Sequence, residues 1–215
     1  LHDCWPITGH CVHFDFIGCE KWKTHCGACP QKKTYPASFF ADRSASNFSL
    51  KEELFSSLPN LTLVPVSQWL SNILQQSFLK ENPIRVIHNG VNTQIFKSVN
   101  NQKLSVKYNL KEKFILLGVA SVWSPRKGLN DFIELSEKLD SSFQIVLVGL
   151  SRKQINTLPK NMIGIKRTES VHELAELYTA ADVFLNPTYE DNFPTTNLES
   201  LACGTPAVSY THLTL

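Results

Sequence analysis

Residues 143–150 of the chain, FQIVLVGL, form an apolar run that is rich in branched side chains. A run of this length and composition predicts a strand that is buried on both faces of a sheet. The segments on either side, GLNDFIELSEKLD at 128–140 and SRKQINTL at 151–158, predict helices, the second one weakly. A strand between two helices is the repeating unit of a parallel α/β sheet.

The same alternation of apolar strands and amphipathic helices extends in both directions from this run. Upstream, KFILLGVAS at 113–121 predicts another strand. Downstream, the predicted order is strand, helix, strand, helix and strand, at MIGIKR (162–167), VHELAELYTAA (171–181), DVFLNP (182–187), TTNLESLAC (195–203) and PAVSY (206–210). The second half of the chain therefore predicts a doubly wound parallel sheet with right-handed crossovers.

The first half of the chain is less regular. Its opening part, residues 4–36, is rich in Cys, His and aromatic residues and has no clear periodicity. After it we expect a helix at 49–58 that begins with a Ser49 capping box, strands at 61–67 and 83–91, and between them a helix capped by Ser67. The predicted domains are 1–96, a polar linker at 97–112, and 113–215.

Composition and charge narrow the possible partners. The net charge of +2 argues against a sequence-wide nucleic-acid or anionic-membrane partner. No run approaches the roughly 18 apolar residues of a membrane helix, and the opening LHDCWPITGH does not have the pattern of a signal peptide. Because Leu1-His2-Asp3 resembles the end of a strand and PAVSYTHLTL stops at the start of one, we expect a fragment.

A basic turn follows the first strand of the second half. SPRKG places Arg126 and Lys127 directly before a helix that begins near Gly128. Two cations beside the free N–H groups of a helix N-terminus would suit a diphosphate. A solvated turn that happens to be basic fits the same residues. Arg152 and Lys153, after the second strand, leave the same two interpretations open.

The stretch YEDNFPTTNLESLACGTP at 189–206 gathers three acids around one short helix. Thr196 and Glu199 have the spacing of a capping box, and Gly204 with Pro206 would end the helix. Helix capping does not account for Glu190 and Asp191, which follow a strand. Carboxylates in that position can accept hydrogen bonds from sugar hydroxyls.

Several motifs in the chain resemble those of family-4 glycosyltransferases of the GT-B fold. They are VIHNGVN, PRKG, YTAADVFLNPT and PTYEDNFPTTNLESLACGTPAV, in the order that the family shows. The opening LHDCWPITGHC resembles a subgroup from bacterial exopolysaccharide and surface-polysaccharide gene clusters. The resemblance implies an α/β protein with two Rossmann-like, doubly wound domains, both incomplete here, the first binding the acceptor and the second the nucleotide-sugar donor.

The resemblance also implies roles for particular residues. Glu199 would bind the ribose of a nucleotide-diphosphate sugar, Asp191 the transferred sugar, and Lys127 the leaving diphosphate. His2 would face the sugar from the acceptor domain. The further donor-binding residues would be Arg126, Glu190, Phe193 and Thr195, and the base would lie near Arg167 and Thr168.

The sequence departs from the family pattern at several positions. The first motif acid is usually Glu, whereas Asp191 stands there and Glu190 precedes it. Ser121 replaces a frequent Arg, and Pro194 lacks an N–H donor. After CGTPAV many members continue toward a Gly-rich turn, whereas SYTHLTL does not.

The reaction that the resemblance implies is retaining transfer of a hexosyl group to a glycan or lipid-linked acceptor in polysaccharide biosynthesis. No cofactor is expected for catalysis. The expected location is cytoplasmic, with peripheral association at the inner face of the membrane left open, and no nucleic-acid partner is expected. The alternative function is a non-catalytic, zinc-stapled binding module with a degenerate transferase fold.

The cysteines pose a separate question. Cys11, Cys19, Cys26 and Cys29 lie close together in sequence and include one C-x-x-C pair. Zinc prefers four such ligands in a tetrahedron, so these residues predict a structural zinc site. Reduced buried thiols and disulfides are the alternatives, and His10 could instead line the acceptor cleft. Cys203 is expected in the core.

Overall fold

A computed structural model describes residues 1–100, 102–110 and 112–209, and it divides the chain into two compact units. The first unit contains residues 1–89 together with the short segment 190–193. The second unit contains the described residues of 90–189 and 194–209. Most of SYTHLTL, the segment that departs from the family pattern, lies outside the described residues.

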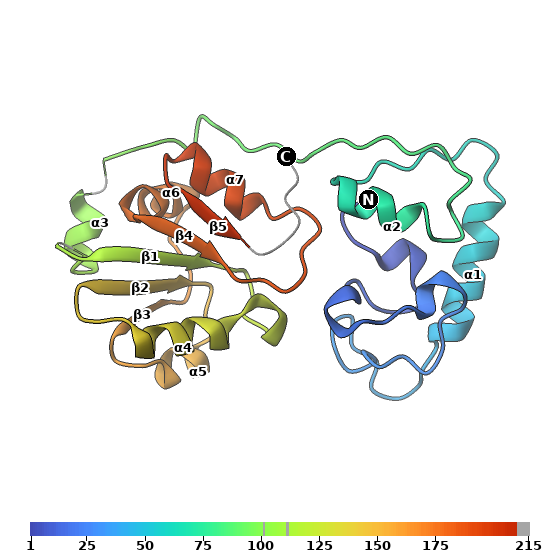
Figure 1. Cartoon of the computed structure of the whole chain (residues 1–215), viewed down its shortest axis with the longest axis horizontal. Helices are drawn as coiled ribbons and strands as arrows, with labels where there is room; N and C mark the ends of the chain where they lie inside the picture. Colours follow the sequence, from blue (N-terminus) through green and yellow to red (C-terminus); the bar gives the residue numbers. More distant parts are fainter. Residues whose placement is uncertain (101, 111, 210–215) are drawn as a thin grey trace. The chain divides into compact units, whose positions relative to one another are not determined.

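The second unit is built on a 5-stranded parallel sheet with the strand order β3-β2-β1-β4-β5 (Figure 1). The strands are β1 Phe114–Val119, β2 Phe143–Val148, β3 Met162–Ile165, β4 Val183–Asn186 and β5 Ala207–Ser209. Each of them lies within a segment that the sequence predicted as a strand. In β2 every residue after Phe143 is buried, as its unbroken apolar run predicted.

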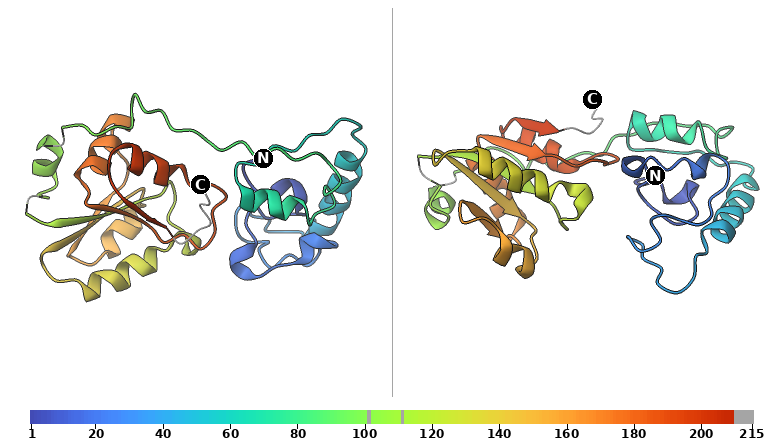
Figure 2. Two further views of the ribbon diagram at one scale, coloured as in Figure 1. Left: turned by 45° about the horizontal axis from the view of Figure 1, so that its top comes forward. Right: turned by 60° about the horizontal axis from the view of Figure 1, so that its bottom comes forward.

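Helices cover both faces of this sheet (Figures 1 and 2). One face carries α6 Val171–Ala180 and α7 Thr195–Ala202, and the other carries α4 Leu129–Lys138 and α5 Arg152–Thr157. Tyr178 and Phe184 belong to the apolar cluster on the α6 side, and Phe132 and Leu147 to the cluster on the α4 side. The predicted doubly wound arrangement is therefore confirmed.

The polar segment at 97–112 differs from the linker that the sequence predicted. It contains a short helix, α3 Gln102–Lys107. Leu104 and Leu110 are 3% and 5% exposed and join the cluster on the α6 side of the sheet. Leu104 and Leu110 thus anchor a segment in which most other residues are polar, and that polar composition is why the sequence indicated a linker.

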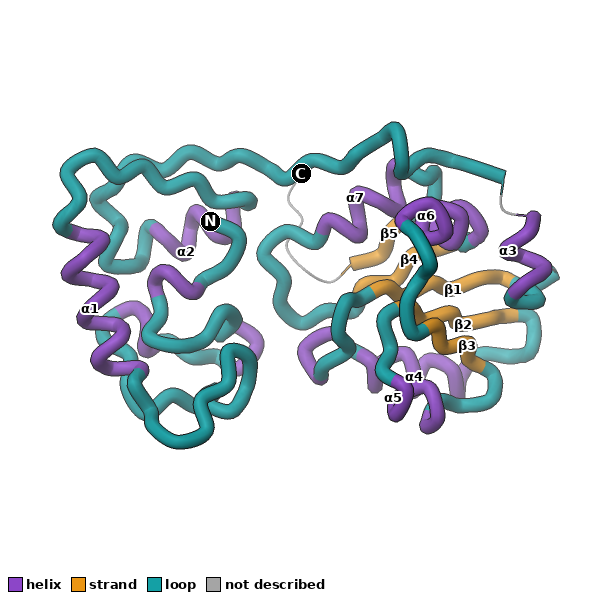
Figure 3. Tube along the Cα trace, turned by 180° about the vertical axis from the view of Figure 1, so that it is seen from behind, coloured by secondary structure: helices purple, strands orange, loops and turns teal. Residues whose placement is uncertain are grey.

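The first unit consists mostly of loops (Figure 3). Its helices are α1 Ser44–Ser56 and α2 Gln68–Leu74, preceded by the 3-10 helices Trp5–Ile7, Asp15–Ile17 and Lys21–Lys23. The Ser67 side chain caps α2 as predicted, accepting a hydrogen bond from the Leu70 N–H at 3.1 Å. The capping box predicted at Ser49 is wrong, because α1 already begins at Ser44.

The two strands predicted in the first unit reduce to a single parallel bridge between Leu63 and Ile84. Backbone hydrogen bonds join Leu63 to Pro83 and Arg85, and the Ile87 N–H donates to the Pro65 carbonyl. Pro65 has no N–H to donate in return, so the ladder cannot continue through it.

Among the described residues, no helix is long and apolar enough to cross a membrane.

Candidate functional site

The carboxyl ends of the parallel strands bring four loops of the second unit to one edge of its sheet. β1 pairs with β2 on one side and with β4 on the other, so the strand order reverses between β1 and β4. Ligands of doubly wound sheets bind beyond the strands at such a switch point. The loop after β1 carries SPRKG, and the segment after β4 leads into the YEDNFP motif.

The two segments at the switch point are hydrogen-bonded to each other. The Arg126 carbonyl accepts the Tyr189 N–H at 2.9 Å and the Thr188 hydroxyl at 3.3 Å. Gly128 has a φ of +75°, and a Cβ there would lie 2.6 Å from the Pro187 carbonyl oxygen. The basic turn therefore requires glycine, both for its backbone conformation and for its close approach to the segment after β4.

The cations of this turn, Arg126 and Lys127, are half-buried rather than fully solvated. They belong to a single 3-10 turn, Pro125–Lys127, that leads directly into α4. Tyr189 adds a further link between the two segments, because its hydroxyl donates to Asp131 in the first turn of α4 at 3.0 Å. The segment after β4 is therefore hydrogen-bonded both to the backbone of the turn and to the first turn of α4.

Glu199 lies on α7 of the second unit and is held by two hydroxyl groups. The Tyr178 hydroxyl donates to Glu199 Oε2 at 2.9 Å, and the Thr195 hydroxyl also hydrogen-bonds the carboxylate. Burial raises the pKa of Glu199 above its usual range, with the two hydroxyl groups acting in the opposite direction. The carboxylate is therefore oriented, and its ionised form is costly in its surroundings.

The capping box predicted for Glu199 is wrong. α7 begins at Thr195, its N-cap is Pro194, and no side chain caps it. The N–H of Asn197 donates to the Pro194 carbonyl. Glu199 thus lies beyond the capping positions, in the middle of an eight-residue helix. Helix capping therefore does not explain why this carboxylate is partly buried, and another role must account for it.

A buried polar network supports the residues around Glu199. The Thr205 hydroxyl donates to the Tyr178 carbonyl at 2.5 Å, and the Ser200 hydroxyl donates to the Thr205 carbonyl at 2.9 Å. Asn186, the last residue of β4, donates to the Asn197 side chain at 2.9 Å. These bonds link α7 to the backbone of α6 at Tyr178 and to the end of β4.

Glu190 belongs to the first unit, where its carboxylate accepts three backbone hydrogen bonds. Oε1 accepts the Phe14 N–H at 3.1 Å, and Oε2 accepts the N–H groups of Asp15 and Phe16 at 2.9 and 3.1 Å. His13 Nδ1 lies 3.6 Å from Oε1. Glu190 is only 2% exposed. These contacts fix it in the first unit, so Asp191 is the more exposed acid of the pair.

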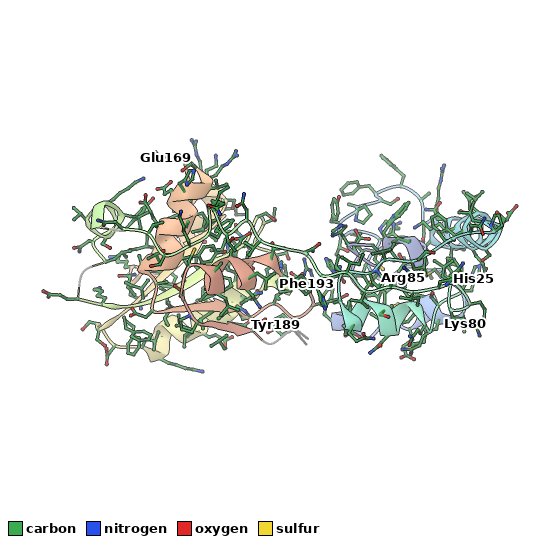
Figure 4. All side chains as sticks on the ribbon, turned by 90° about the horizontal axis from the view of Figure 1, so that it is seen from above. His25, Lys80, Arg85, Glu169, Tyr189 and Phe193 are labelled. Carbon is green, nitrogen blue, oxygen red and sulfur yellow. The ribbon has the colours of Figure 1, made fainter. Side chains whose placement is uncertain are left out.

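The rest of the segment 190–193 is also tied to the first unit. The Asn192 side chain donates to the His2 carbonyl at 2.8 Å and faces the Cys4 thiol at 3.8 Å. Phe193, labelled in Figure 4, stacks on His88 with ring centroids 5.1 Å apart. Asp191 is half-buried, and its Oδ1 accepts the Phe193 N–H at 3.3 Å.

The predicted site residues thus form two groups. Arg126, Lys127, Thr195 and Glu199 lie in the second unit, and His2, Glu190, Asp191 and Phe193 lie in the first. Arg167 and Thr168 follow β3, at the same sheet edge as the residues of the second unit. Sequence reasoning missed Tyr178, because its place on an apolar helix face indicates only a core residue.

The cysteines that the sequence singled out lie in the first unit. Cys11, Cys19, Cys26 and Cys29 all line one small cavity, and all are free thiols. Burial, followed by the neighbouring thiols, raises the pKa of Cys11 to about 12. Cys203 is buried in the core of the second unit, as predicted.

Comparison with known proteins places the chain in a family. The model of the family "Glycosyl transferases group 1" matches residues 100–214, which is 115 of the 215 residues. The chain belongs to this family, and its parallel α/β fold is of the GT-B type. The predicted resemblance is therefore confirmed over the second half of the chain.

Two curated bacterial relatives match parts of the chain. An alpha-galactosylglucosyldiacylglycerol synthase of Streptococcus pneumoniae is 36% identical over 107 residues, 44% of this chain and 28% of the relative. The N,N'-diacetylbacillosaminyl-diphospho-undecaprenol alpha-1,3-N-acetylgalactosaminyltransferase of Campylobacter jejuni is 30% identical over 141 residues, 59% of this chain and 36% of the relative. The chain spans about a third of the length of these relatives.

Two solved structures have a similar fold. Sucrose-phosphate synthase from Thermosynechococcus elongatus superposes with a TM-score of 0.66 at 21% identity, over 85% of this chain and 46% of the other. Anabaena Alr3699/HepE in complex with UDP-glucose gives a TM-score of 0.60 at 19% identity, over 76% and 48% of the two chains. At these identities the likeness concerns the fold alone.

Proposed function

We propose that the chain binds a nucleotide-diphosphate sugar and transfers its hexosyl group, with retention, to a glycan or lipid-linked acceptor in polysaccharide biosynthesis. The observation that carries the proposal is the environment of the Glu199 carboxylate. Its carboxylate is partly buried, raised in pKa and oriented by Tyr178 and Thr195, yet it does not cap its helix. A carboxylate maintained at that cost, in a family of glycosyltransferases, is a candidate ligand site.

The first step of the proposal is that Glu199 binds the ribose. A ribose offers two adjacent hydroxyl groups, and a carboxylate can accept a hydrogen bond from both. Tyr178 already fixes Oε2 by a bond of 2.9 Å, so little side-chain freedom remains to be lost when the ligand binds. Hydrogen bonds to a charged group contribute about 1.5–3 kcal/mol each.

The second step assigns the diphosphate to the basic turn. Lys127 and Arg126 lie on a turn at the switch point that is fastened to the segment after β4. In the transition state negative charge builds up on the departing diphosphate, and a cation already held in place stabilises it without further reorganisation. We assign this role to Lys127, with Arg126 assisting.

The third step concerns the transferred sugar. Asp191 is the motif acid that is half-buried rather than enclosed, and we assign it to the sugar hydroxyls. The neighbouring Asn192 binds the His2 carbonyl, so His2 and the motif segment belong to one hydrogen-bonded group. His2 is the candidate for a further contact with the sugar.

The proposed donor and acceptor classes follow from the similar proteins. One solved neighbour is a complex with UDP-glucose, and one curated relative is named for transfer to a diphospho-undecaprenol-linked sugar. These names support a uridine diphosphate sugar as the first donor to test and a lipid-linked saccharide as the first acceptor.

The proposal is tested by isothermal titration of the purified protein with UDP-glucose, UDP-N-acetylglucosamine, UDP-galactose and GDP-mannose. At least one donor is expected to bind, and Glu199→Ala should weaken the binding of that donor about 10- to 100-fold, as expected for the loss of one charged hydrogen bond. Glu137→Gln is the matched control, because Glu137 is exposed on α4.

Transfer is measured separately, as release of the nucleotide diphosphate in the presence of a lipid-linked saccharide. Lys127→Ala should lower kcat by about 10²–10³-fold, whereas Lys138→Ala at the other end of α4 should not. Donor affinity that is the same in Glu199→Ala and wild type would refute the site. Donor binding without transfer to any acceptor would favour a non-catalytic binding module.

A further inference from the structure

Four cysteine side chains surround one small cavity in the first unit. Cys11, Cys19, Cys26 and Cys29 all line it, and none forms a disulfide. The thiols of Cys11 and Cys29 are hydrogen-bonded to each other, and Cys19 and Cys26 lie near enough to act electrostatically on Cys11. Four cysteines are the ligand set of one class of structural zinc site.

Backbone donors already point at the two sulfurs of the C-x-x-C pair. The Gly9 N–H hydrogen-bonds the Cys26 sulfur, and the Gln31 N–H hydrogen-bonds the Cys29 sulfur. Each of these bonds restricts the orientation of a cysteine side chain that lines the cavity. Donors of this kind also orient the ligands in metal sites.

Two lysines supply positive charge beside the cavity. Lys21 lines it and fixes the C-x-x-C turn, donating to the carbonyls of Gly27 and Ala28 at 2.8 and 3.0 Å. Lys51 is 8% exposed and interacts electrostatically with Cys26. A zinc ion with four thiolates carries a net charge of −2, and a partly buried anion of that size needs nearby cations.

The chain around the cavity has little regular secondary structure. Between Leu1 and Arg43, all of which the structure describes, the only helices are three 3-10 turns of three residues each, and there is no strand. Segments with so little regular structure are commonly stabilised by a metal or by disulfides.

We propose that Cys11, Cys19, Cys26 and Cys29 bind one structural Zn²⁺ ion. Among the described residues, no three His, Cys, Asp or Glu side chains are already arranged to hold a metal, so binding must turn the thiols toward the cavity centre. His10 is the competing ligand, because it lines the same cavity and its Nε2 is buried without a hydrogen bond. This site does not depend on the proposed sugar transfer.

The test is the metal content of the purified protein, measured by mass spectrometry after expression with added zinc. The expected result is about one zinc per chain in wild type. Cys19→Ser and Cys29→Ser should lose most of it. Cys203→Ser and Cys4→Ser are the matched controls, because both residues are buried thiols outside the cavity, and they should keep the full content.

A second measurement uses only the wild-type protein, so it does not depend on the folding of a variant. Thiol reactivity is followed with a colorimetric disulfide reagent before and after a zinc chelator. We expect the chelator to expose four further thiols together with the release of zinc. Protein that folds without zinc, an intact mass that shows disulfides, or zinc lost in His10→Ala but kept in Cys19→Ser would each overturn the proposal.

Discussion

The two units of this chain are stabilised in different ways. In the second unit, parallel strands with apolar side chains are packed between helices, and residues such as Leu117, Val146 and Phe184 are completely buried. In the first unit, charged side chains take over part of that role. Lys51 is buried against the carbonyls of Trp5 and Thr8, at 2.6 and 2.8 Å from its Nζ.

The comparison shows how a unit without strand ladders can satisfy its buried backbone groups. A backbone group buried outside helices and sheets still needs a hydrogen-bond partner, and in the first unit side chains provide it. Burial lowers the pKa of Lys51 to about 8, which measures the cost of placing a charge there. We therefore expect the stability of the first unit to be sensitive to loss of its buried polar side chains. The stability of the second unit should be sensitive to loss of apolar volume from its core.

The largest expected effect is in the core of the second unit. Phe184→Ala removes a fully buried ring that packs edge-on against Tyr178 with centroids 5.5 Å apart. The free energy of unfolding should fall by about 3–5 kcal/mol because a cavity remains. Urea denaturation measures this change. Val208→Ala, on the adjacent strand at 59% exposure, is the control and should have little effect.

A somewhat smaller effect is expected at the anchor of the first unit. Glu190→Ala leaves the N–H groups of Phe14, Asp15 and Phe16 without their acceptor. The expected loss of stability is about 2–3 kcal/mol. Hydrogen exchange should show faster exchange at these amides. Asp191→Ala at the neighbouring position should cost less stability yet impair sugar transfer, and the reverse pattern would contradict the assigned roles of the two acids.

The smallest expected effect is at Glu199, and it has the opposite sign. Because the folded state raises the pKa of Glu199, the folded protein binds the proton more tightly than the unfolded chain. Stability therefore falls as pH rises above the ordinary glutamate pKa. Glu199→Gln should therefore gain stability at neutral pH, by less than either of the two losses above. This gain should vanish on acidification, and thermal unfolding at several pH values measures it.

The sequence predicted the second unit well because its signals are local. Each strand is a continuous apolar run, and Ser151 with Gln154 even forms a capping box at the start of α5. In the first unit the run at 61–67 has strand composition, but Pro65 interrupts the ladder. A single proline in a short run was too weak a signal against five strand-favouring neighbours.

The candidate site was predictable only in part. The order of the motifs identified the family, and the spacing of Asp191 and Glu199 indicated the candidate residues. The hydrogen bond from Tyr178 to Glu199 joins residues 21 positions apart on different helices, and the bonds from Glu190 span 174 to 176 positions. Contacts between residues so far apart in sequence depend on the tertiary fold, and no local sequence pattern predicts them.

Hydrogen exchange with and without a saturating nucleotide-diphosphate sugar, UDP-glucose first, tests the central claim most directly. The account places the nucleotide and diphosphate at the carboxyl edge of the second unit's sheet. It predicts slower exchange at 121–128, 166–168 and 195–199, with no change in the core strands. Protection that is absent from these segments while the donor is bound, or that is confined to residues 4–36, would contradict it.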